Sequence, residues 1–150
     1  MEEKKYEKYI SKVKDATKIS FESHKLIGVE LGPVYTLLGE DVMPDSDIRV
    51  AVCYVLKGRV NSSYSDYVDL HTHDVSEGYV FLSEEPKNLE TDVRLSEELY
   101  QIKSPVAVFV PPGVKHKFKI TKEHGFLITI FPMKGSYNEH TFPVSKDETR

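Results

Sequence analysis

The sequence predicts an all-β domain whose strands close into a barrel or a sandwich. Short runs rich in β-branched and aromatic residues recur along the chain, and clusters of turn residues separate them at a regular spacing, which is typical of such folds. In the run 114–120, three apolar residues and a histidine alternate with lysines, as expected of a strand with one buried and one wet face. The sequence contains no internal repeat, so nothing indicates two fused barrels.

The size and composition indicate one globular domain. A chain of 150 residues is near the commonest domain size, and 7 Phe and 9 Tyr supply bulky side chains for a core and a pocket. We expect a helical extension over 1–18, the barrel over 19–133 and a polar C-terminal tail over 134–150 that runs over the surface.

The charge and the apolar runs exclude several classes of partner. A net charge of −4, with lysines scattered among acids, gives no basic field, so we expect no nucleic acid partner. No apolar run approaches the roughly 20 residues that cross a bilayer, and the first residues lack the apolar stretch of a secretory signal. The single cysteine, Cys53, is expected to be a buried structural thiol. These features predict a cytoplasmic protein without membrane contact.

The first predicted element is a short amphipathic helix within residues 1–18. This segment is rich in helix formers. Four apolar residues recur there at positions i, i+3, i+4 and i+7, namely Tyr6, Tyr9, Ile10 and Val13. We expect the helix to pack across one end of the barrel or against a partner subunit.

Nine strands are predicted after this helix. They lie near residues 33–38, 48–57, 66–73, 77–83, 89–95, 98–103, 106–110, 114–121 and 125–131. Turn residues at 111–113 and 122–125 frame the strand that carries His116. On the strand at 48–57, Arg49 has the parity opposite to Val50 and Val52, so we expect its side chain to face solvent.

The segment 69–77 carries the strongest functional signal. His71 and His73 are two residues apart on a strand, so both imidazoles point to one side. After a short bend, Glu77 opens the next strand and adds a carboxylate to the same point. His116 comes from the inward face of a later strand. Three imidazoles and one carboxylate suit a divalent metal ion, and Fe, Mn, Co, Ni, Cu and Zn are all compatible.

These residues resemble the two motifs of the cupin superfamily. The first is matched by His71-Thr72-His73 through Glu77, and the second by the segment 111–116, which ends at His116. The resemblance covers about residues 48–131. It implies a double-stranded β-helix, or jelly-roll, barrel that holds one metal with those four side chains. The family's habit of pairing barrels also implies a homodimer.

The departures from the family's pattern lie at structural positions and spare the ligands. Four residues stand where the family usually has glycine or asparagine, namely Ser65, Glu84, Pro105 and Ile120. An inserted polar loop at 84–88 is expected to change what covers the site.

Strand parity suggests further pocket residues. If Glu77 points inward, so does Tyr79, which makes Tyr79 the candidate catalytic residue for orienting a ligand; an aromatic core filler is the alternative. Three further residues are expected to form apolar walls, namely Phe118, Phe126 and Ile128. Three histidines outside the motifs are expected to be solvated, namely His24, His124 and His140.

The open ligand set leads to three functional hypotheses. The favoured one is a metal-dependent enzyme with dioxygenase-type chemistry on a small oxygen-rich substrate. The alternatives are a metal-dependent isomerase or epimerase of sugars or sugar phosphates, and a barrel that binds a small ligand without turnover. Fold alone does not choose among them, because cupins include all three.

Overall fold

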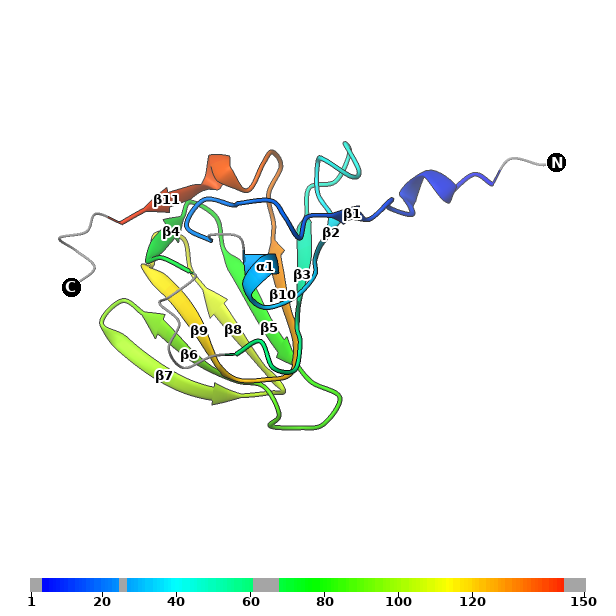
Figure 1. Ribbon diagram of the computed structural model, residues 1–150. Helices are drawn as coiled ribbons and strands as arrows, with labels where there is room; N and C mark the ends of the chain where they lie inside the picture. The colour runs from blue at the N-terminus through cyan, green and yellow to red at the C-terminus, as the bar shows by residue number, and fades with distance from the viewer. Residues whose placement is uncertain (1–3, 25–26, 61–67, 145–150) are drawn as a thin grey trace.

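The computed structural model describes residues 4–24, 27–60 and 68–144, and these form two antiparallel sheets that face each other as a jelly roll (Figure 1). The larger sheet has the strand order β1-β2-β3-β10-β5-β8, and the smaller has β11-β4-β9-β6-β7. The predicted all-β class is confirmed. Among the described residues, no helix is long and apolar enough to cross a membrane.

The bounds of β2 to β10 follow the nine predicted runs, whereas the short strands β1 and β11 were not predicted. The larger sheet contains β1 (Lys14–Asp15), β2 (Val34–Leu38), β3 (Arg49–Val55), β10 (Gly125–Phe131), β5 (Glu77–Leu82) and β8 (Val106–Val110). The smaller contains β11 (Thr141–Pro143), β4 (His71–His73), β9 (His116–Lys122), β6 (Glu90–Leu95) and β7 (Glu98–Lys103). The helical turns are η1 (Glu7–Tyr9), α1 (Ile27–Glu30) and η2 (Asn138–His140). Of the strand predicted at 66–73, residues 66 and 67 lie outside the described part.

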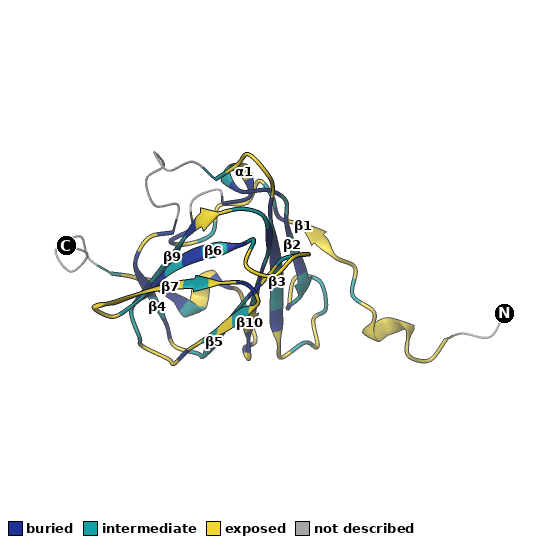
Figure 2. Ribbon diagram, turned by 90° about the horizontal axis from the view of Figure 1, so that it is seen from below, coloured by how far each residue is buried: buried dark blue, intermediate teal, exposed yellow. Residues whose placement is uncertain are grey.

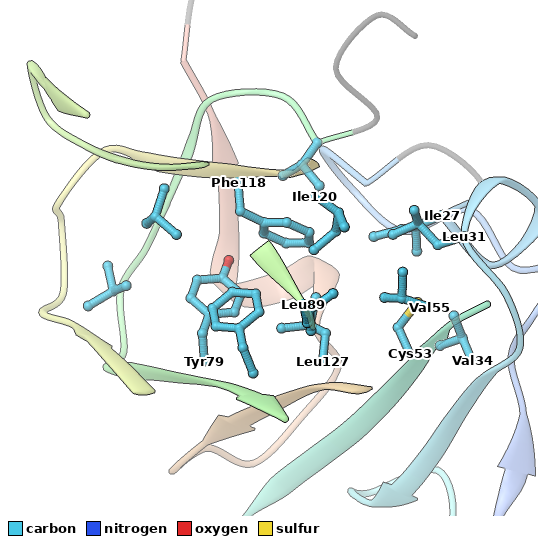
Figure 3. Close-up of a cluster of buried hydrophobic side chains, with 14 of the residues drawn as sticks. Ile27, Leu31, Val34, Cys53, Val55, Tyr79, Leu89, Phe118, Ile120 and Leu127 are labelled. Carbon is cyan, nitrogen blue, oxygen red and sulfur yellow. The ribbon is translucent and has the colours of Figure 1, made fainter. Parts of the chain in front are cut away.

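The core fills the space between the two sheets (Figure 3). Its centre is aromatic, because Tyr79 and Phe81 of β5 meet Phe118 of β9. Ile27 and Leu31, in and just after α1, join the same buried cluster and close one side of it. Burying side chains of this size supplies most of the stabilisation of a small domain.

The outer face of the larger sheet is also apolar, which two predictions did not allow for. Phe126 and Ile128 of β10 pair across that face with Tyr54 and Val52 of β3, so the expectation that they line the pocket is wrong. By the same parity Arg49 points inward, where only 5% of it is exposed. The prediction of a solvated Arg49 failed because both faces of β3 carry apolar residues.

The N-terminal segment forms an arm that extends away from the barrel (Figure 2). Over residues 4–18, the predicted amphipathic helix is present only as the single 3₁₀ turn η1. Its apolar residues are exposed, with Tyr6 at 65% and Ile10 at 76%, so they do not pack across the barrel end. A short helix without a packing partner is marginal in water, which explains its brevity.

The C-terminal segment does more than run over the surface. Its strand β11 pairs with β4, which carries two of the predicted metal ligands. Tyr137 and Thr141 are buried, at 8% and 4% exposure. The expectation that the tail runs over the surface is therefore wrong for residues 134–144. The polar residues of this segment are interspersed with side chains that pack or hydrogen-bond inside the domain.

Candidate metal centre

The structure brings the four predicted ligands together inside the barrel. His71 and His73 come from β4, Glu77 opens β5, and His116 begins β9 and pairs directly with His71. One ligand atom from each residue lies within 4.8 Å of the others. All four side chains are buried, with exposures of 2% or less.

Main-chain carbonyls orient the three imidazoles. The Nδ1 atoms of His71, His73 and His116 lie 2.7, 3.1 and 2.8 Å from the carbonyl oxygens of Asp69, His140 and Val114, respectively. A proton on each Nδ1 would be donated to that carbonyl, which leaves Nε2 with a lone pair for the site. The same arrangement orients histidines in known metal centres.

The atoms that face the centre fit a metal ion. Glu77 Oε1 lies 3.0 Å from His116 Nε2 and 3.4 Å from His73 Nε2. Within the described part of the chain, the buried Nε2 atoms of His71 and His73 have no hydrogen-bond partner. Buried polar atoms normally have one, and a divalent cation would satisfy all four residues.

The protonation states also suit a metal. Burial, with the imidazoles of His24 and His116 nearby, lowers the pKa of His71 well below its ordinary value. Burial acts to raise the pKa of Glu77, but the adjacent imidazoles of His116 and His73 outweigh it and lower that pKa. A neutral imidazole and a charged carboxylate are the forms that bind metal.

The turn before β9 ties the second motif to the first. Gly113 has φ +80°, a left-handed conformation that glycine adopts at little cost. Its amide donates a hydrogen bond of 2.8 Å to the carbonyl of His73. The Pro-x-Gly turn therefore holds β4 beside the start of β9, where His116 lies.

His24 belongs to this site, although it was predicted to be solvated. It is buried, and its ring centroid lies 4.7 Å from that of His71. Its Nδ1 atom lies 2.7 Å from the Tyr137 hydroxyl oxygen. Burial lowers the pKa of His24 to about 4. Nothing near His24 in sequence indicates these contacts, because Tyr137 is 113 positions away.

His140 was also predicted to be solvated, yet it contributes to the site's surroundings. Its carbonyl accepts the hydrogen bond from His73, and its ring Nδ1 lies 2.7 Å from Asp74 Oδ1. His124 lies elsewhere, beside a surface hollow at the far end of β5 with Glu84 and Asn88. The loop at 84–88 therefore does not cover the metal centre, since Glu77 is at the opposite end of that strand.

Tyr79 is fully buried beside the ligands. Its ring centroid lies 5.9 Å from that of His116, and it stacks on Phe81. Burial and the negative charge of Glu77 raise its pKa well above the ordinary value. Its hydroxyl has no hydrogen-bond partner among the residues described, so a ligand-orienting role stays a prediction.

A cavity of about 70 Å³ adjoins the centre. Its wall is mostly apolar and includes Phe118, as predicted, and its polar residues include Glu77, His24, Arg49 and Thr129. A wider hollow of about 380 Å³ lies outside it. Three residues line both spaces and so mark the entrance, namely Phe21, Arg49 and Tyr137.

Comparison with known proteins identifies the fold. No protein-family model matches the chain, and no curated protein matches it. Oxalate decarboxylase from Bacillus subtilis superposes with a TM-score of 0.56 at 14% identity, over 77% of this chain and 28% of that one. The DMSP lyase DddQ from Ruegeria pomeroyi DSS-3 gives 0.53 at 18%, over 74% and 50%.

A third structure is closer in length. A cupin 2 domain-containing protein from Halorhodospira halophila gives a TM-score of 0.53 at 14% identity, over 77% of this chain and 71% of that one. The chain thus spans less than a third of the decarboxylase and half of the lyase. At these identities the likeness shows the fold alone.

Proposed function

Starting from a chain with the cupin fold, we propose that it is a metal-dependent enzyme for a small oxygen-rich substrate. His71, His73, Glu77 and His116 would hold one divalent transition metal, of the group Fe, Mn, Ni, Co, Cu and Zn. The observation that carries the proposal is the pair of buried Nε2 atoms that have no partner among the described residues and lie around Glu77 beside a cavity. The Mn(II) centres of the similar oxalate decarboxylase support a divalent metal.

The chain's own residues have two tasks in this proposal. The carbonyl contacts of the imidazoles fix the ligand geometry. The apolar wall around Phe118 and Leu127 excludes water from the cavity. A bound metal would supply Lewis-acid polarisation of a substrate oxygen and, if it is redox-active, activation of dioxygen.

Dioxygenase chemistry is our preferred reaction class. A dioxygenase places both oxygen atoms in its product, so it needs no external reductant. An isomerase needs a base near neutrality to move a proton. Of the described residues that line the cavity, His24 is the available imidazole, and its pKa of about 4 makes it a weak base.

The test begins with elemental analysis of protein purified without a histidine tag. We expect one divalent metal per chain. Oxygen uptake by the Fe(II)-loaded protein across a panel of diketones and phenols would then support dioxygenase chemistry. Turnover of an aldose or ketose without oxygen uptake would favour the isomerase, and ligand binding without either reaction would favour a non-catalytic barrel.

The partner expected at the protein level is a second copy of the chain. The outward residues of the larger sheet include no charged side chain on β3, β10, β5 or β8. They are Val50, Val52, Tyr54, Phe126, Ile128, Ile130, Gly78, Val80, Leu82, Ala107 and Phe109. Two such faces can meet without repulsion between like charges, as a twofold interface requires. We expect this homodimer to act in the cytoplasm, in keeping with the buried thiol of Cys53.

A further inference from the structure

Arg49 occupies an unusual position for a charged residue. It begins β3, is almost fully buried and lines both the cavity beside Glu77 and the hollow outside it. Buried charges in proteins are normally paired and fully hydrogen-bonded, because desolvation is costly. The hydrogen-bond and ion-pair partners of Arg49 therefore bear on its function.

The pairing of Arg49 is incomplete. A guanidinium has five N–H donors, but in the described part of the chain it makes one hydrogen bond, from Nη1 to Asp41 Oδ1 at 3.3 Å. Asp41 is 36% exposed and also pairs with Lys14 Nζ at 3.8 Å. A long contact to a partly exposed, shared carboxylate is weak and easily exchanged.

The surroundings of the guanidinium favour a planar anion. The ring of Phe21 lies beneath it, with the guanidinium carbon 5.8 Å from the ring centroid. Tyr137 packs edge-on against Phe21 at 5.6 Å. Aromatic side chains thus flank the one cationic group on the described cavity wall, and the N–H fork of arginine matches a carboxylate in two-point contact.

We propose that Arg49 is a carboxylate-binding subsite and that the natural ligand is a small carboxylic acid. The ligand's carboxylate displaces Asp41 from the guanidinium, and the rest of the ligand extends through the cavity toward Glu77. This subsite names the substrate class of the proposed enzyme. It rests on the proposed function only in placing the other end of the ligand at the metal centre. The size of the cavity, about 70 Å³, restricts the acid to a few carbon atoms.

Binding of pyruvate, compared with its uncharged ester methyl pyruvate, tests the subsite directly. Calorimetry uses the full-length protein as purified and again after chelation of metal. We expect pyruvate to bind in both states and the ester to bind at least about tenfold more weakly, as for a lost charged hydrogen bond. The chain has only four arginines, so the Nε–H signal of Arg49 can be assigned by NMR and should shift with pyruvate alone.

Two substitutions give opposite expected effects. Arg49→Met should weaken pyruvate binding at least about tenfold, with Arg49→Lys intermediate because it keeps the charge but not the fork. Asp41→Asn should strengthen binding several-fold, because it weakens the competing anion. Arg94→Met is the matched control, since Arg94 lies on β6, pairs with Glu97 and lines neither space; its pyruvate affinity should be unchanged.

Several outcomes would overturn the subsite. They are equal affinity for the acid and the ester, an unmoved Arg49 signal on pyruvate binding, or unchanged pyruvate affinity in folded Arg49→Met. Binding of inorganic phosphate but not pyruvate would also refute it. Asp41→Asn and the NMR signal keep the test valid if Arg49→Met does not fold. Because the chelated protein is measured too, a missing metal would refute the enzyme without affecting the subsite.

Discussion

At the scale of single residues, main-chain carbonyls hold the imidazoles of the candidate metal ligands in place. This means that removing one imidazole leaves the strands in place, because the ladder contacts involve main-chain atoms. We predict that His73→Ala and His116→Ala each lower the affinity for the metal at least about tenfold while the barrel stays folded. Elemental analysis and circular dichroism measure the two effects.

The control for these variants is His124→Ala, because His124 lies at the other end of the barrel. Its metal content should equal that of the parent protein. Full metal occupancy in both His73→Ala and His116→Ala would contradict the assignment of the centre.

The buried thiol gives a prediction about pH. Burial raises the pKa of Cys53 to about 12, so the thiol should resist thiol reagents in the native protein at pH 8. The folded state keeps its proton longer than the unfolded state, whose thiol titrates near pH 8.5. The stabilisation that the protonated Cys53 thiol gives the folded state is therefore complete below the pH at which the unfolded thiol titrates, and it is lost as pH rises toward 12. Cys53→Ala should flatten the alkaline decline in the free energy of unfolding; an equally steep decline would contradict this account.

The clustering of the four candidate ligands could be predicted from sequence, but the residues around them could not. His71, His73 and Glu77 are close in the chain, and strand periodicity alone gives their common direction. The contact of His24 with Tyr137 joins segments 113 positions apart, and no local pattern encodes it. Arg49 was assigned to solvent because its neighbours Val50 and Val52 are apolar.

At the scale of the elements, β9 shows why alternation was informative there. Its inward residues are buried and its outward lysines, Lys117 and Lys119, are partly exposed, so polarity distinguishes the two faces. On β3 and β10 both faces are apolar. Strand periodicity therefore shows which residues share a face, but not which face points into the core. The positions of β2 to β10 were therefore predictable, whereas β1 and β11 were missed. The faces were predictable only where one of them is wet.

The inward face of β9 should dominate stability. Phe118 is buried against Tyr79 and Phe81, so we predict that Phe118→Ala lowers the free energy of unfolding by about 3–5 kcal/mol. Leu99→Ala is the comparison, because Leu99 on β7 is 64% exposed, and its effect should stay within about 0.5 kcal/mol. Urea unfolding of both variants measures this, and similar midpoints would disprove the inward assignment.

At the scale of the whole molecule, the uncharged outer face formed by β3, β10, β5 and β8 predicts association. Phe109 is 67% exposed and Ile130 39% exposed on that face, and an exposed apolar patch of this kind typically marks an interface. We predict that the protein sediments at micromolar concentration with twice the 17.2 kDa mass of one chain. Phe109→Glu and Ile130→Glu should shift it to the monomer mass.

Leu99→Glu provides the control for this experiment, since it places the same charge on an exposed position of the other sheet. It should leave the dimer intact. A mass near 17.2 kDa for the parent protein would exclude the interface. This surface could not be predicted from the sequence, because the strand periodicity of one chain does not show which exposed face a partner would cover.

The hydrogen bond between Tyr137 and His24, with the carbonyl that His140 offers to His73, means that part of the site's surroundings follows the last candidate ligand along the chain. All four candidate ligands lie at or before His116, whereas Tyr137 and His140 come after it. Truncation after residue 133 would therefore keep all four side chains of the proposed centre and remove two residues that pack and hydrogen-bond beside it.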